Sequence, residues 1–81
     1  MYYTYTISST IKSYIYVGIS NNPERRISEH NKGKERTIKP YRPFKTLLIE
    51  EFKTRSEARK REKYLKSGCG KEYLKTLKPG W

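Results

Sequence analysis

The sequence predicts a single α+β domain: a small antiparallel or mixed sheet of three strands flanked by helices, in the order β-β-α-β-α-α. Three observations lead to this fold class. Two Tyr- and Thr-rich stretches open the chain, a capped helical stretch precedes a third apolar run, and two helical stretches follow that run. Connections are short and no linker divides the chain, so residues 1–81 are expected to form one domain.

The first two strands are predicted at residues 2–8 and 14–19, joined as an antiparallel hairpin. Alternation places Tyr5 on one face of the first strand, and Tyr16 and Gly18 on one face of the second. A glycine inside a strand indicates a bend or a close backbone approach. Neighbouring tyrosines on adjacent strands usually form a packing pair, and that is the alternative to any catalytic role.

The first helix is predicted to begin at Pro23, because Asn22 suits the N-cap and proline suits the first helical position. It is expected to run through His30, with Gly33 as its stop. The polar and basic residues 31–43, which include two prolines, are predicted to form a loop.

The third strand is predicted at residues 44–52, which hold an apolar run. Residues 54–57 match a capping box and open a second helix at residues 55–66. The Gly-Cys-Gly run at residues 68–70 is expected to interrupt the helical pattern, and residues 71–77 are predicted to form a short third helix.

The charge balance indicates an anionic partner. Lys and Arg total 19 against 8 Asp and Glu, a net charge of +11, which favours nucleic acid or an anionic membrane over a merely solubilising surface. No apolar run is long enough to span a membrane, and no signal peptide pattern opens the chain. A single cysteine is consistent with a reducing cytoplasmic setting. One histidine without a Cys/His cluster excludes a structural zinc site.

Exposed basic residues are the candidates for contacts with nucleic-acid phosphates. Such contacts give affinity that falls steeply with salt and carry little sequence information. For the loop residues the alternative is a flexible, solvated segment. The candidates are Lys32, Lys34, Arg36, Lys39 and Arg42 in the loop and Arg55, Lys60 and Lys63 on the second helix.

Arg26 and His30 are spaced i, i+4 and therefore share one face of the first helix. The planar guanidinium of arginine binds two phosphate oxygens at once, although position alone favours a solvated helix residue for Arg26. His30 is able to bond a tyrosine or relay a proton. The alternative for His30 is a C-terminal cation that the helix dipole stabilises.

Glu62 shares a helix face with Ala58 and Leu65, so its carboxylate is expected to point toward the sheet. A single carboxylate is enough to hold a Mg²⁺ ion that keeps waters and phosphate oxygens as its other ligands. The alternative is an ion pair with a neighbouring cation such as Lys66.

In this order along the chain, these residues resemble the GIY-YIG nuclease superfamily. The two motifs that name the family stand here as Tyr3-Thr4-Tyr5 and Tyr16-Val17-Gly18. The stretch Arg26–His30 resembles the helix that carries the family's arginine, and Ala58–Glu62 resembles its metal-binding glutamate helix. Residues 61–75 look like the small stand-alone bacterial members, which are uncharacterised endonuclease-like proteins.

The resemblance implies a DNA endonuclease that uses one Mg²⁺ or Mn²⁺ ion. Tyr5 would help to deprotonate water, Tyr16 would position water or phosphate, and Arg26 would stabilise the charged phosphoryl group. His30 would orient or assist the phenol, and Glu62 would hold the metal. We expect the two phenols, the guanidinium and the carboxylate to line one shallow groove, with weak sequence preference and branched or damaged DNA as the substrate.

Two positions depart from the family pattern, and two other functions remain open. Tyr3 replaces the glycine of the first motif, and Ile19 stands where some DNA-repair members carry a lysine. That cation must be absent here or supplied by another side chain.

The alternative functions are a non-catalytic nucleic-acid-binding module with the same fold, and a small basic protein that associates with RNA or the ribosome. The sequence leaves open whether a partner protein supplies targeting, and which oligomeric state the chain adopts.

Overall fold

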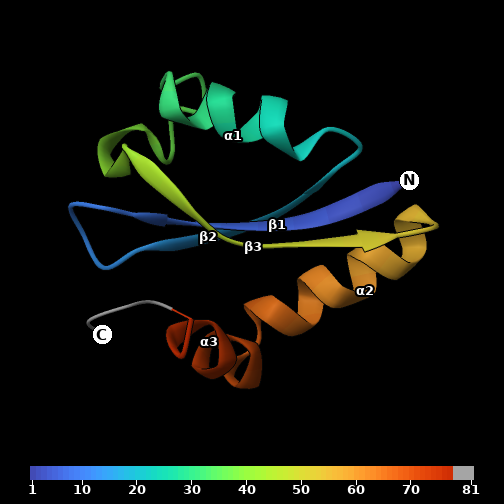
Figure 1. The fold of residues 1–81 in the computed structure, drawn as a ribbon. Coiled ribbons are helices and arrows are strands. Elements are labelled where there is room, and N and C mark those ends of the chain that lie inside the picture. The colour runs from blue at the N-terminus through green and yellow to red at the C-terminus, as the bar shows by residue number, and fades with distance from the viewer. Residues whose placement is uncertain (78–81) are drawn as a thin grey trace.

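The computed structural model describes residues 1–77, which form one three-stranded sheet with helices on both faces (Figure 1). This confirms the predicted α+β class and the order β-β-α-β-α-α. No helix within residues 1–77 is both long and apolar enough to cross a membrane. The elements are β1 (Tyr2–Ser9), β2 (Ile15–Ser20), α1 (Pro23–Asn31), the 3-10 helix η1 (Lys39–Tyr41), β3 (Phe44–Phe52), α2 (Arg55–Lys66) and α3 (Gly68–Lys75).

The sheet is antiparallel throughout, with β1 in the centre between β2 and β3. In the β1–β2 hairpin, Tyr5 lies opposite Gly18 and Ile7 lies opposite Tyr16. The register of β1 with β3 shifts between Thr6 and Ile7. Because β2 and β3 are the outer strands, each has one free edge.

Helix α1 covers one face of the sheet (Figure 1). It begins as predicted: Asn22 Oδ1 accepts a hydrogen bond from the backbone N–H of Arg25 at 3.2 Å, and Pro23 is the first helical residue. Gly33 follows the helix with a φ of +79°, which fits the predicted stop. Ile27 packs on the core cluster of this face. The buried members of that cluster are Tyr5, Ile7, Ile38 and Phe44.

The connection between α1 and β3 is more ordered than the predicted loop. It contains η1, and it buries Ile38, which is 2% exposed. The side chain of Asn31 also accepts a hydrogen bond from the backbone N–H of Phe44 at 2.6 Å. The burial of Ile38 and the hydrogen bond between Asn31 and Phe44 therefore hold the basic connection between α1 and β3 against the α1 face of the sheet.

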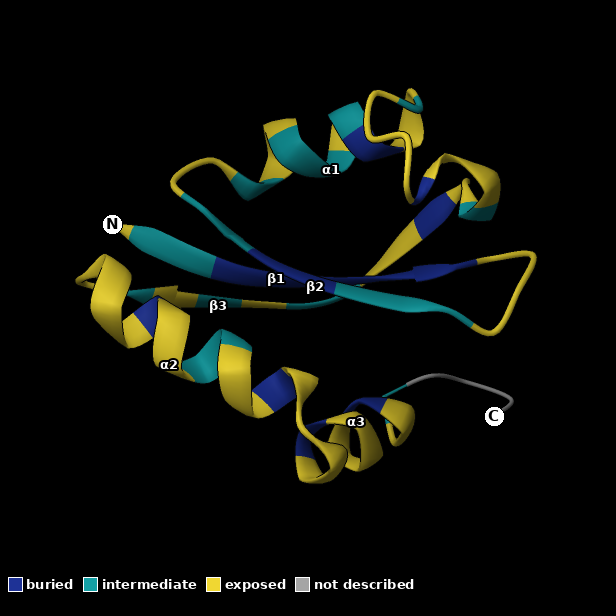
Figure 2. Cartoon of the chain, turned by 180° about the vertical axis from the view of Figure 1, so that it is seen from behind, coloured by how far each residue is buried: buried dark blue, intermediate teal, exposed yellow. Residues whose placement is uncertain are grey.

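Helices α2 and α3 cover the opposite face (Figure 2). Thr54 caps α2 by accepting a hydrogen bond from the backbone N–H of Glu57 at 3.2 Å, as the capping box predicts. Ala58 and Leu65 are fully buried beneath the sheet. The buried core cluster of this face consists of Val17, Leu65 and Leu74.

The expected interruption at residues 68–70 was misplaced. The break falls at Ser67, which caps α3 and accepts a hydrogen bond from the backbone N–H of Gly70 at 3.3 Å, so both glycines lie inside the helix. A Cβ atom at Gly70 would collide with the backbone of Tyr64 and Leu65. The glycine is there because the two helices meet backbone to backbone, a requirement that is set by tertiary packing.

Candidate active site

The site begins with Tyr5 on the central strand, whose side chain points to the α1 face and is 1% exposed. The neighbouring position on β2 must be small, because a Cβ atom at Gly18 would lie 2.6 Å from the Tyr5 hydroxyl oxygen. The glycine of the second motif therefore makes room for a phenol. The predicted close approach is found, although it involves a side chain and not a second backbone.

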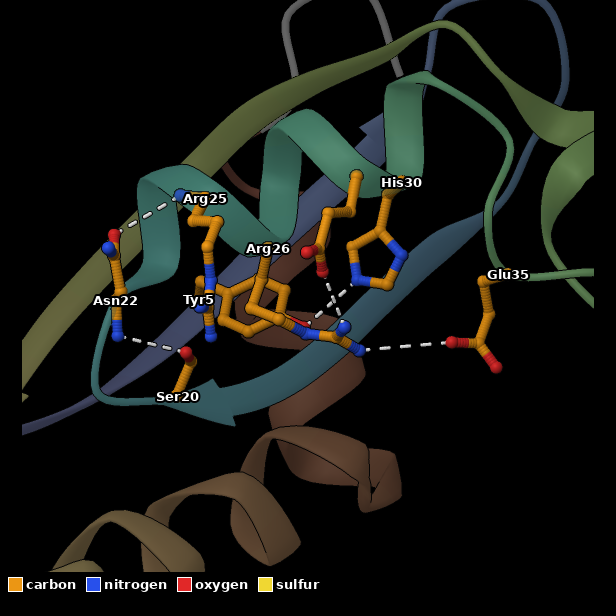
Figure 3. A network of polar contacts seen from close by, with 8 residues as sticks. Tyr5, Ser20, Asn22, Arg25, Arg26, His30 and Glu35 are labelled. Carbon is orange, nitrogen blue, oxygen red and sulfur yellow. Dashed lines mark hydrogen bonds and ion pairs between the residues drawn. The ribbon is translucent and has the colours of Figure 1, made fainter.

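His30 reaches Tyr5 from the last turn of α1. The hydroxyl oxygen of Tyr5 and Nε2 of His30 are 3.0 Å apart, and His30 is 1% exposed (Figure 3). Burial, and then the charge of Arg26, lower the pKa of His30 and favour its neutral ring. The geometry thus supports a tyrosine partner for His30 over a charged histidine at a helix end.

The Tyr5 contact is what orients this imidazole. Within residues 1–77 the other ring nitrogen of His30, Nδ1, is buried and has no hydrogen-bond partner. The contact can run in either direction, depending on which nitrogen carries the hydrogen. Packing against aromatic rings completes the setting: Tyr16 lies 5.0 Å from His30 and 6.2 Å from Tyr5, measured between ring centroids.

Arg26 descends from α1 one turn before His30 and lies beside the Tyr5 hydroxyl (Figure 3). Its side chain is 35% exposed, and it pairs with Glu29 at 2.8 Å and with Glu35 at 3.8 Å. Burial works to lower the pKa of Arg26, but its contacts with Tyr5 and Glu29 outweigh that effect and raise it. Arg26 is therefore a half-buried cation that Tyr5 and Glu29 hold in place, and it is not a solvated helix residue.

These surroundings keep Tyr5 in its neutral form. Burial, reinforced by the nearby Tyr16, raises the pKa of Tyr5 to about 12, and the opposing effect of Arg26 is smaller. At neutral pH Tyr5 is thus a phenol that exchanges hydrogen bonds. The deprotonated phenolate form is not populated to a significant extent at that pH.

Glu62 stands apart from this cluster, since α2 covers the opposite face of the sheet (Figure 1). Its side chain is 14% exposed, so it does point inward with Ala58 and Leu65. Its carboxylate pairs with Lys66 at 3.3 Å, which is the alternative that the sequence left open. The structure therefore gathers four of the five predicted catalytic residues on one face, and the fifth comes from the other helical layer.

The two layers meet at the free edge of β2. A cleft of about 270 Å³ there is lined by Arg26 from α1, by Arg55 from α2 and by Ile19 from β2. A second cleft along the same strand is lined by Tyr16 and by Lys66, the partner of Glu62.

Sequence reasoning assigned Arg55 to general DNA contacts and missed that it lines the same cleft as Arg26. Periodicity alone could not reveal it, because the two residues lie on different helices. The other predicted DNA-contacting residues are exposed, but Arg42 donates a hydrogen bond to the backbone carbonyl of Lys32 at 3.2 Å and braces the basic segment. The remaining candidates are Lys32, Lys34, Arg36, Lys39, Lys60 and Lys63.

The motifs, the fold and the Tyr5–His30–Arg26 cluster define the class of protein. The chain matches the model of the GIY-YIG catalytic domain over residues 1–75. It therefore belongs to the GIY-YIG family, a superfamily of nucleases, as the motifs indicated.

Within this class, the chain is similar to small proteins of the UPF0213 family. It is 41% identical over 68 residues to a UPF0213 protein of Enterococcus faecalis, covering 76% of this chain and 77% of that one. It is 34% identical over 77 residues to one from Staphylococcus haemolyticus, covering 94% and 93% of the two chains. The solution NMR structure of the UPF0213 protein BH0048 from Bacillus halodurans matches with a TM-score of 0.56 and 30% identity, covering 99% of this chain and 88% of that one.

Proposed function

We propose that this chain is a divalent-metal-dependent DNA endonuclease that hydrolyses phosphodiester bonds with weak sequence preference. The proposal rests on the 3.0 Å contact between the Tyr5 hydroxyl and His30 Nε2, with Arg26 beside it. A buried Tyr–His pair next to a partly exposed guanidinium combines a path for a proton with a binding site for phosphate. Membership of a nuclease superfamily supports the same chemistry.

Arg26 and Arg55 are proposed to hold the phosphate. Both line the cleft at the β2 edge, so two guanidinium groups from different helices can face one anion. A phosphate there would compete with Glu29 and Glu35 for Arg26. We assign to Arg55 the charge that related nucleases carry as a lysine at the position of Ile19.

Tyr5 is proposed to take a proton from the attacking water while it gives its own to His30. One proton arrives at the phenol oxygen as the other leaves for Nε2, so no phenolate has to form beforehand. This sequence agrees with the pKa of about 12 that burial imposes on Tyr5. It requires that the resting imidazole carries its hydrogen on Nδ1. Tyr16, beside both rings, is proposed to position the water or a phosphate oxygen.

Glu62 is proposed to hold one Mg²⁺ or Mn²⁺ ion. No group of three His, Cys, Asp or Glu side chains able to hold a metal occurs within residues 1–77, so the protein would contribute a single carboxylate. That donor set fits Mg²⁺, which keeps waters and phosphate oxygens as its other ligands. Lys66, 55% exposed, can turn into solvent and free the carboxylate. When bound, the ion supplies positive charge that stabilises the phosphoryl group.

The substrate is proposed to be DNA in the cytoplasm, branched or damaged DNA in particular, as in repair or recombination. The exposed lysines and arginines of the α1–β3 connection and of α2 would contact its backbone, with affinity that falls as salt rises. Such contacts are indifferent to sequence, and a partner protein would then supply any targeting.

A non-catalytic nucleic-acid-binding module is the competing function. It is favoured by the ion pair between Glu62 and Lys66 and by the separation of Glu62 from Tyr5 on opposite layers. In a pure binder that carboxylate would remain paired, and no metal would be needed.

The decisive experiment incubates the purified protein with supercoiled plasmid and with branched DNA, in Mg²⁺, in Mn²⁺ or in EDTA. The test variant is Glu62→Gln. Its matched control is Glu72→Gln, because Glu72 is also a helical glutamate paired with a lysine, Lys75, at 3.6 Å. We expect cleavage only with metal. The cleavage rate should fall at least about a hundredfold in Glu62→Gln and should stay at the wild-type level in Glu72→Gln.

Two results would overturn the endonuclease proposal. Cleavage that persists in EDTA or in Glu62→Gln would contradict the role of the metal. Binding of DNA without cleavage by the wild-type protein in either metal would establish the non-catalytic module.

A further inference from the structure

Two carboxylates contact Arg26, and they differ in how firmly they hold it. Glu29, from the same helix, lies 2.8 Å from Nη1 of Arg26, and its side chain is 26% exposed. Glu35 comes from the connection between α1 and β3, and its carboxylate lies 3.8 Å from Nη2 (Figure 3). That distance is too long for a hydrogen bond, and the Glu35 side chain is 46% exposed. The Glu29 contact is therefore a fixed hydrogen bond, whereas the Glu35 contact is a loose ion pair.

The Glu29 contact is built into helix α1. Residues three positions apart lie on the same side of a helix, so this pair forms without any contribution from a substrate. The hydrogen bond with Arg26 also lowers the pKa of Glu29, so its carboxylate is charged at neutral pH. Because the guanidinium contacts the Tyr5 hydroxyl as well, Glu29 and Tyr5 together fix the direction in which Arg26 points.

Glu35 is the exception within its own segment. Residues 31–43 contain five lysines and arginines but a single acidic residue, which is Glu35. The segment that is proposed to contact DNA phosphates thus places its one acid on the arginine that is proposed to bind the reacting phosphate. Exposed ion pairs contribute little free energy, so a phosphate that is also held by neighbouring cations can displace this carboxylate.

We propose that Glu29 positions Arg26 for the reaction, and that Glu35 covers the Nη2 end of Arg26 until a DNA phosphate displaces it. A phosphate bound in bidentate fashion needs two N–H groups of one guanidinium. Since Glu29 keeps its hydrogen bond at Nη1, the Nη2 end is the one that the phosphate gains. The positioning role rests on the proposed nuclease function, whereas the displacement of Glu35 requires only that DNA binds at Arg26.

Displacement of Glu35 can be measured as DNA binding in EDTA, where cleavage plays no part. Fluorescence anisotropy gives the affinity of a labelled duplex for the wild-type protein, for Glu35→Gln and for the matched control Glu51→Gln. Each is prepared with Arg26 intact and with Arg26→Gln. Glu51 is an exposed acid on β3, at the opposite edge of the sheet from β2, so the control removes the same charge away from the site.

With Arg26 intact, Glu35→Gln should bind the duplex about three- to fivefold more tightly than Glu51→Gln does, because no ion pair has to be broken. In the Arg26→Gln background, the two substitutions should have equal effects. Equal affinities of the two variants with Arg26 intact would overturn the displacement of Glu35. An advantage of Glu35→Gln that survives Arg26→Gln undiminished would overturn it as well.

The positioning role of Glu29 can be measured on Arg26 itself. NMR relaxation of the Arg26 Nε nitrogen reports the mobility of that side chain in the free protein. Glu29→Gln should make the Arg26 side chain as mobile as the exposed Arg36, and Glu35→Gln should leave it ordered. An Arg26 side chain that stays ordered in Glu29→Gln would refute the positioning role.

Single-turnover cleavage then separates the two acids. Glu29→Gln should lower the rate at saturating protein at least about tenfold, because a displaced guanidinium stabilises the phosphoryl group less well. Glu35→Gln should instead lower the protein concentration that gives half the maximal rate, and Glu51→Gln should match the wild-type protein in both quantities. Because the binding and relaxation measurements require no cleavage, a chain that passes both and cuts no DNA would support the assignment of Glu35 while refuting the nuclease proposal.

Discussion

Both faces of the sheet bury apolar and polar side chains, but only the α1 face brings titratable groups together. Under α1 the buried groups include the hydroxyl of Tyr5 and the imidazole of His30, with the Arg26 guanidinium beside them. Under α2 and α3 the apolar cluster consists of Val17, Leu65 and Leu74, and strand alternation adds the buried hydroxyls of Thr4 and Thr6. Buried polar groups cost stability unless they are fully hydrogen-bonded. The α2–α3 layer, whose buried groups do not titrate, is expected to stabilise the fold, and the α1 layer is expected to carry the chemistry.

The largest effect is expected from Tyr5→Phe in the α1 layer. It removes the hydroxyl that links His30 and Arg26 but keeps the ring in the core, so cleavage should fall by about 10²–10⁴-fold. The free energy of unfolding should change by only about 1 kcal/mol. Single-turnover cleavage and urea denaturation measure the two quantities. An active Tyr5→Phe protein would place the chemistry elsewhere.

Leu65→Ala should have the reverse profile in the α2–α3 layer. Leu65 is fully buried, so its truncation leaves a cavity and should lower the free energy of unfolding by about 2–5 kcal/mol. For the fraction that remains folded, the cleavage rate should be close to that of the wild-type protein. A rate per folded molecule reduced as strongly as in Tyr5→Phe would abolish the distinction between the two layers.

Gly18→Ala tests the place where the strand geometry serves the site directly. The added methyl group would lie 2.6 Å from the Tyr5 hydroxyl oxygen and must displace it, at a cost of about 1–3 kcal/mol in stability. Because the displaced hydroxyl loses its contact with His30, cleavage should fall as well. Gly68→Ala is the matched control, since a Cβ atom there meets nothing within 4 Å.

The smallest effect concerns pH. Burial, and then Arg26, lower the pKa of His30 below 6.5, so between that folded value and 6.5 the unfolded chain binds more protons. Stability from the neutral ring is thus present above pH 6.5 and is lost as pH falls, by at most about 1.4 kcal/mol per pH unit. His30 is the single histidine, so the pH profile of His30→Gln should be flatter below pH 6.5. Identical profiles in urea denaturation would show that the folded environment does not disfavour the charged ring.

Local rules were sufficient for most of the fold. Alternation and capping residues located the strands and the first two helices within a residue or two, because those signals act between near neighbours in the chain. They failed at Ile38 and at Gly70. A buried isoleucine in a basic connection, and a glycine required by the contact between two helices, depend on tertiary packing that no local pattern records.

The candidate site divides in the same way. The i, i+4 spacing of Arg26 and His30 was visible in the sequence, and the structure brings both residues to Tyr5, as the family resemblance implied. The inward orientation of Glu62 was also visible, but periodicity does not say which face of a sheet a helix covers. For that reason the position of Glu62 in the layer opposite Tyr5, and the cleft that Arg26 and Arg55 line together, required the three-dimensional arrangement.

The outer position of β2 carries a consequence for assembly. An outer strand offers unpaired backbone N–H and C=O groups, which can accept a further strand from another polypeptide. A polypeptide added along β2 would cover Tyr16 and the cleft between Arg26 and Arg55 together. Strand addition at β2 would thus block access to the proposed active site. An oligomer that keeps the site accessible must therefore form its interface through β3 or through the helices.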